Sequence, residues 1–152
     1  MKIYHVISVL VPLAIIFTLP YLLQKTGCKT EKKYRTLLYV ACGLFFISWY
    51  LPSPLIHGQD TSFVTHFVGG GVFTGLVWIY LAQSFKWRSH WLLEGFSLFA
   101  LVSALGCVNE LFELFANETG LASIVISETN WDILANTLGA ACVYVVYKIA
   151  SR

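Results

Sequence analysis

Hydrophobic residues gather into five stretches along the chain. Each is about as long as a helix that crosses the hydrocarbon core of a bilayer, which needs about 20 apolar residues. The stretches cover residues 3–23, 37–55, 63–85, 91–115 and 131–149. Only short polar segments separate them, so no room is left for a soluble domain. The pattern predicts one all-α domain over residues 1–152, a polytopic membrane bundle of five transmembrane helices.

Prolines mark the first two stretches. Pro12 and Pro20 lie inside the first, where we expect them to kink the helix because proline removes a backbone donor. The second is expected to stop at the turn Pro52-Ser53-Pro54. The first stretch lacks the small-x-small cleavage site of a signal peptide, and we expect it to be retained as a membrane helix.

Composition supports a membrane protein. Hydrophobic residues make up 57% of the chain and charged residues 12%, whereas a soluble domain carries about 25% charged residues. So little charge would not cover the surface of a soluble domain in water. The net charge of +2 is too small to indicate a nucleic-acid partner. We therefore expect an integral membrane protein whose partners are membrane lipids.

Basic and acidic residues divide between the two ends of the predicted bundle. Nine of the ten lysines and arginines fall after the first stretch, after the third, or at the C-terminus. Basic loops stay in the cytoplasm, so the C-terminus is predicted inside and the N-terminus outside. Acidic residues contribute little to orientation, yet six of the eight lie near the outer end. These are Asp60, Glu110, Glu113, Glu118, Glu128 and Asp132.

A histidine and a run of glycines open the third stretch. His66 lies about one turn inside it, and ionisable groups at membrane depth are candidates for function. Gly69-Gly70-Gly71 follows, with Gly71 and Gly75 in a GxxxG pattern that lets another helix approach closely. Close packing is the favoured interpretation of this run, because a phosphate-binding loop would join a strand to a helix.

Polar residues also line the outer turns of the fourth stretch. Asn109, Glu110 and Glu113 are spaced three and four apart, so they share one stripe of a helix. Two carboxylates at this spacing repel, which favours a proton, a cation or a histidine beside them. The alternative is that the helix ends earlier and both glutamates face water.

Asp132 and Asn136 lie one turn apart at the start of the fifth stretch. One interpretation is structural: Asp132 favours the positive end of the helix dipole, and Asn136 bonds to a neighbouring helix. The other is that these groups share an outward-facing cavity with those of the other helices. Its candidate ligand-binding residues are His66, Asn109, Glu110, Glu113, Asp132 and Asn136, with Asp60 at the mouth.

Such a cavity would suit a polar ligand, a lipid headgroup or a cation. One histidine among carboxylates matches a hard or borderline divalent metal. The candidate metal ligands are His66, Glu110, Glu113 and Asp132.

The same residues resemble the VanZ-like superfamily, which includes the YjdF-like membrane proteins. The resemblance covers about residues 60–141 and rests on three motifs. They are His66, Glu110-x-x-Glu113, and Asp132-x-x-x-Asn136-x-x-Gly139-Ala140. The family carries an aspartate four residues before the histidine, where this chain has Ser62. The resemblance implies a bacterial plasma-membrane protein of the cell envelope, linked to sensitivity to glycopeptide antibiotics.

Four functions remain open at this point. The first is a binding protein that holds a polar, lipid-linked or glycopeptide ligand and modulates the envelope. The second is an intramembrane enzyme on a lipid-linked substrate, using a metal or the acid/base pair His66 and Glu113. The third is an ion-coupled transporter, which with five spans would require a homo-oligomer. The fourth is a structural bundle whose polar groups satisfy one another.

Overall fold

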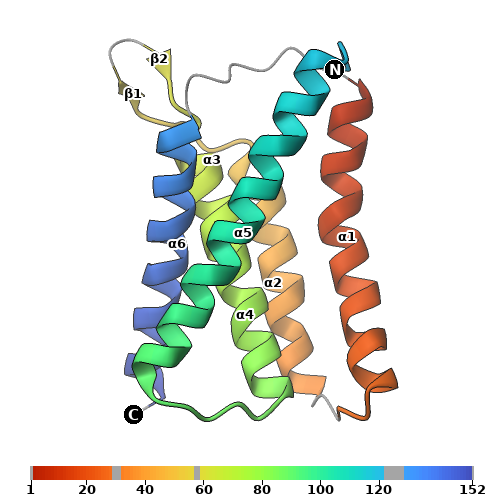
Figure 1. Cartoon of the computed structure of the whole chain (residues 1–152), viewed down its shortest axis with the longest axis vertical. Coiled ribbons are helices and arrows are strands. Elements are labelled where there is room, and N and C mark those ends of the chain that lie inside the picture. The colour runs from red at the N-terminus through yellow and green to blue at the C-terminus, as the bar shows by residue number, and fades with distance from the viewer. Residues whose placement is uncertain (1, 29–31, 57–58, 122–128, 152) are drawn as a thin grey trace.

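The computed structural model describes residues 2–28, 32–56, 59–121 and 129–151. Long helices run side by side along the longest axis of the molecule (Figure 1). A two-residue antiparallel strand pair lies at one end. The elements are α1 Lys2–Lys25, α2 Lys32–Ser48, β1 Leu55–Ile56, β2 Gln59–Asp60, α3 Phe63–Thr65, η1 His66–Val72, α4 Phe73–Ser84, α5 Trp91–Glu118 and α6 Thr129–Ala150.

Within the described residues, four segments are long and apolar enough to cross a membrane, as expected of an integral membrane protein. They are Val6–Lys25, Phe63–Ser84, Trp91–Glu118 and Asn130–Ala150. These correspond to the first, third, fourth and fifth predicted stretches. Helix α1 continues through both Pro12 and Pro20. The described part of the chain is therefore helical, apart from the short strand pair and the connections between elements.

The predicted second span, residues 37–55, is wrong in its bounds. Helix α2 begins at Lys32 and has 17 residues, so it ends at Ser48. Pro52 has no N–H to donate to the Ser48 carbonyl, and proline disfavours helical geometry in the residue before it. The Ser48 carbonyl instead accepts hydrogen bonds from the Leu51 N–H at 3.2 Å and the Thr65 hydroxyl at 3.3 Å.

The third span contains a π-helix that the hydrophobic pattern did not predict. Segment η1 holds seven residues, His66–Val72, between the α-helical segments α3 and α4. Its wider hydrogen bonding continues to the Phe73 N–H, which donates to the Val68 carbonyl. π-Helices are rare and occur often at functional sites. This one begins at the candidate histidine.

Helix α4 lies at the centre of the packing. Its two sides contribute to two apolar clusters: Tyr80 packs with Leu38 of α2, and Trp78 packs with Leu98 of α5. Helix α6 contacts η1 extensively, whereas α1 contacts mainly α2. Helix α5 is inclined to its neighbours (Figure 1). The core thus comprises η1, α4 and α6 with α2 and α5, and α1 is peripheral.

Candidate functional site

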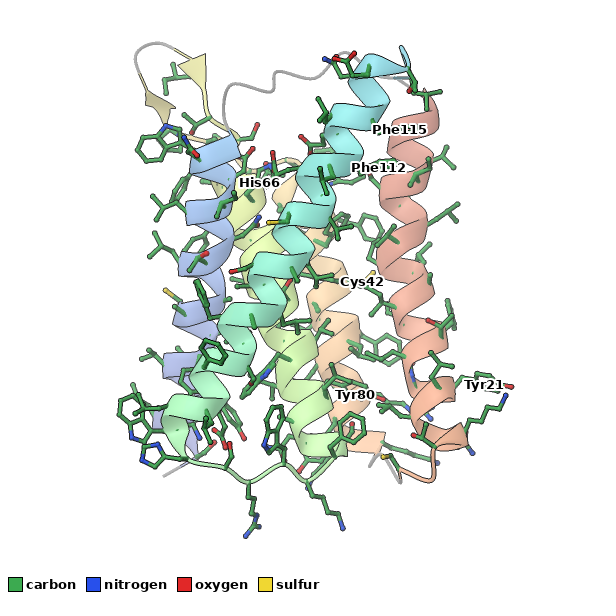
Figure 2. All side chains as sticks on the ribbon, in the orientation of Figure 1. Tyr21, Cys42, His66, Tyr80, Phe112 and Phe115 are labelled. Carbon is green, nitrogen blue, oxygen red and sulfur yellow. The ribbon has the colours of Figure 1, made fainter. Side chains whose placement is uncertain are left out.

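Three side chains from three different elements meet at one end of the bundle. His66 comes from η1, Glu110 from α5 and Asp132 from α6, and one ligand atom of each lies within 4.8 Å of the others. The His66 Nε2 atom is 3.4 Å from the Asp132 Oδ1 atom. The side chain of His66 is 16% exposed and that of Asp132 is 7% exposed. Figure 2 shows His66 near the N-terminal end of α6. We call these three residues the outer cluster.

Backbone and hydroxyl contacts fix the start of the helix that carries His66. Ser62 precedes this helix with a φ of 50°, so the chain turns sharply as it leaves the strand pair. The Val64 N–H then donates to the Ser53 hydroxyl at 3.0 Å. The Thr65 hydroxyl bond to Ser48 ties the same turn to α2. His66 is therefore anchored to the end of α2.

Glycines allow η1 and α6 to approach until their backbones touch. A side chain on Gly71 would collide with the Asn136 carbonyl, and one on Gly139 would collide with the Phe67 carbonyl. This confirms the prediction that the glycine run serves close helix packing. The close approach also explains how His66 and Asp132, on separate helices, come within contact distance.

Asn136 lies one turn further along α6 from Asp132. Its side chain fills the space above Gly70, and the residue is 6% exposed. Its Oδ1 atom has no hydrogen-bond partner among the described residues, so the predicted bond to a neighbouring helix is not formed there. A buried carbonyl oxygen without a donor costs roughly 1–3 kcal/mol. This polar group is therefore difficult to explain by packing alone.

The remaining predicted site residues lie beside the outer cluster. The Asn109 side-chain amide donates to the Glu113 carboxylate at 2.9 Å, as the four-residue spacing predicted. Glu113 is not part of the three-residue group with His66. Helix α5 continues to Glu118, so the alternative of an earlier helix end is wrong. Asp60 belongs to β2, and its side chain lies outside the described part of the structure.

The charge of the outer cluster favours a cation. Two carboxyl groups lie beside one histidine, and like charges this close destabilise each other unless a proton or cation compensates. Imidazole nitrogen and carboxylate oxygen are both ligands of borderline divalent metals. Three protein ligands would also leave a coordination position for another molecule.

A second polar network lies at the opposite end of the bundle, and here the charges are paired. Lys148 of α6 forms an ion pair with Glu94 of α5. The Trp78 indole donates to the Ser97 hydroxyl at 3.0 Å. The Gln83 amide donates to the Tyr147 hydroxyl at 2.7 Å. We call these six residues the inner network. It joins α4, α5 and α6.

The inner network was not predicted from the sequence. Glu94 and Lys148 are more than fifty positions apart in the chain. No local spacing signals such a pair. Glu94 lies in the first turn of α5 and Lys148 in the last turn of α6. The antiparallel packing of these two helices brings the two residues together.

Comparisons of the chain with models of protein families, with curated proteins and with solved structures give no match. The assignment of function therefore rests on the geometry of the site and on the motifs of the sequence.

Proposed function

We propose that the outer cluster is a binding site for a divalent cation in a small integral membrane protein. The cation would in turn hold a polar ligand at the outer membrane face. The observation that carries this proposal is the convergence of His66, Glu110 and Asp132 from three elements within 4.8 Å. None of the three is close to another in sequence, so the convergence is a property of the fold.

The topology we propose has five crossings, with the N-terminus outside and the outer cluster at the external face. The end of α1, the start of α2, the α4–α5 loop and the end of α6 lie at one end of the bundle (Figure 1), and the basic residues of the sequence are concentrated in or beside these segments. The positive-inside rule makes that end cytoplasmic. Helix α2, at 17 residues, is about 25 Å long. Lysines at its start can reach the interface by extending along the helix.

The distances favour one shared ion over three separate interactions. Bonds of about 2.1 Å to a common ion place ligand atoms roughly 3.0–4.2 Å apart, according to the coordination geometry. The 3.4 Å separation between His66 and Asp132 is within that range. The widest separation, up to 4.8 Å, needs a contraction of about half an ångström, which a small side-chain rotation supplies.

The ligand we propose for the open coordination position is polar or anionic. A lipid headgroup, a lipid-linked precursor and a glycopeptide all carry oxygen atoms suited to a hard or borderline cation. The resemblance to the VanZ-like superfamily motivates the setting of this proposal. It is the bacterial plasma membrane, with an effect on cell-envelope antibiotic sensitivity.

Cation binding tests the proposal directly. Purified full-length protein, freed of metal with a chelator, is titrated with Mn²⁺ or Zn²⁺ by calorimetry. We expect one ion per chain, and at least a tenfold loss of affinity in Asp132→Asn because a charged ligand is removed. Glu118→Gln serves as the matched control, since Glu118 is an exposed acid on the same end of α5. The absence of binding, or equal losses in both variants, would contradict a site at the outer cluster.

The contact between His66 and Asp132 supports a second candidate, an intramembrane enzyme. A carboxylate beside an imidazole orients the ring and fixes its tautomer, as a general base requires. The partner of His66 is then Asp132, at 3.4 Å, in place of the predicted Glu113. Turnover of a lipid-linked substrate that is lost in His66→Ala and Asp132→Asn would favour this function. Cation binding without turnover would favour the binding protein.

A further inference from the structure

A groove between α1 and α2 opens near the basic end of the bundle, far from the outer cluster. Its volume is about 320 Å³, within the range of small-molecule sites. Four polar side chains contribute to its lining: Tyr21 and Gln24 of α1, and Arg35 and Tyr39 of α2. Ile16, Phe17 and Pro20 provide its apolar part, further from the helix ends. The groove therefore has a polar and an apolar end, like a membrane lipid.

The polar side chains of this groove are not engaged by other residues in the described part of the chain. Arg35, Gln24, Tyr21 and Tyr39 form no hydrogen bond or ion pair with other described residues. Tyr21 and Tyr39 are 63% and 58% exposed. Figure 2 shows Tyr21 at this end of α1, directed outward from the bundle. A guanidinium with no carboxylate partner among the described residues, flanked by hydroxyl and amide groups, favours an anionic ligand.

We propose that this groove is a binding site for one anionic phospholipid from the leaflet at the basic end of the bundle. The phosphate would pair with Arg35, and the headgroup hydroxyls would bond to Gln24. An acyl chain would lie against Ile16 and Phe17. The site is independent of the outer cluster and of any function proposed there.

Charge and size favour a lipid over a second protein chain. Lys25, Lys32 and Lys33 belong to the same two helix ends as Arg35, and basic residues near a membrane surface attract anionic lipid. A helix from a second protein is about 10 Å across, and a stable protein interface buries more than about 1,000 Å². The groove is too small for such a partner, but its volume accommodates a lipid headgroup and the start of an acyl chain. Phe17, at 72% exposure, borders it on the side open to the bilayer.

Lipid binding to the full-length protein in detergent, followed by native mass spectrometry, tests this site. The probes are phosphatidylglycerol and phosphatidylcholine with the same acyl chains. We expect the first to bind about tenfold more tightly, and Arg35→Gln to remove most of that preference, since a charge-assisted hydrogen bond is lost. Arg35→Lys should retain part of this preference, because lysine keeps the positive charge but lacks the planar guanidinium that can donate two hydrogen bonds to one phosphate. Phe17→Ala should weaken both lipids alike.

The matched control is Arg88→Gln. Arg88 is an exposed arginine at the same end, in the α4–α5 loop and outside the groove. We expect a change of less than twofold in this variant. Glycerol 3-phosphate, added as a competitor, should not displace the lipid, because it has no chain for the apolar end.

Three outcomes would overturn the proposal. Equal weakening by Arg35→Gln and Arg88→Gln would show diffuse attraction to the basic end without a site. Equal affinity for the two lipids would show that the headgroup charge is not recognised. Displacement by glycerol 3-phosphate would show an anion site without a lipid. Both arginines are exposed, so both variants should fold, and circular dichroism checks this.

Discussion

The two ends of the bundle hold buried charge in opposite ways. In the inner network, the carboxylate of Glu94 is balanced by the ammonium of Lys148, and neighbouring hydrogen bonds join three helices. In the outer cluster, two carboxylates face one imidazole. The first arrangement balances its charge within the protein. The second gathers two acidic groups around one histidine, a set of ligands that suits a cation.

This difference separates a structural role from a binding role. A buried ion pair whose removal would leave an uncompensated charge holds helices in place. A cluster with excess charge of one sign lowers the stability of the protein until a ligand binds. Substitutions at the two ends should therefore affect stability and cation binding differently.

The same glycine substitution should have opposite results at the two ends. Gly71→Ala places a methyl group against the backbone of α6, so it should lower the free energy of unfolding by about 3 kcal/mol and abolish cation binding. Gly95 lies beside the inner network, and the methyl group of Gly95→Ala would be 3.5 Å from the Tyr144 ring, an ordinary van der Waals distance. It should leave stability unchanged or raise it by up to about 1 kcal/mol. Thermal unfolding in detergent measures both, and equal losses would refute the close approach of η1 and α6.

Removing the cation of the inner network should be the next largest effect. Lys148→Met leaves the buried Glu94 without its partner, which should cost about 2 kcal/mol. The loss is smaller than for a fully buried pair, because the side chain of Lys148 is 33% exposed. Adding Glu94→Gln to this variant should restore most of the stability. Cation affinity at the outer cluster should not change in either protein, and a parallel loss of affinity would show that the two ends are coupled.

Glutamate-to-glutamine substitutions should shift stability in opposite directions at the two ends. In the presence of a chelator, Glu110→Gln removes one of two like charges and should stabilise the protein by about 0.5–1 kcal/mol. It should also remove the stabilisation that added Mn²⁺ gives to the unaltered protein. Glu94→Gln should lower stability in both conditions. Loss of stability in both variants would mean that Glu110 has a structural role.

The smallest effect should come from a single hydrogen bond of the inner network. Ser97→Ala removes the acceptor of the Trp78 indole, and interhelical hydrogen bonds in membrane proteins average about 0.6 kcal/mol. We expect a loss of that size in chemical unfolding and unchanged cation affinity. Thr137→Ala provides the control, because the Thr137 hydroxyl donates to the Ile133 carbonyl of its own helix.

Much of the outer cluster could be predicted from the sequence. Hydrophobic length located the helices, and the alternation of loops between two sides placed His66, Glu110 and Asp132 at one end. The choice of Glu110 over Glu113 was not predictable. These two residues differ by three positions on one helix, so the rotation and tilt of α5 decide which of them faces His66. That rotation is fixed by contacts with η1, α4 and α6, which no local pattern records.

The sequence by itself determined which segments are apolar enough to lie in a membrane and how charge divides between the ends, because both depend on local composition. Only the tertiary structure decided the π-helix at His66, the pairing of Glu94 with Lys148 and the groove beside Arg35. The end of α2 shows both influences: Pro52 removes the helical donor, and Thr65 of another helix supplies a replacement. Contacts between residues far apart in the chain depend on how whole helices pack, and that packing gives each polar group its partner.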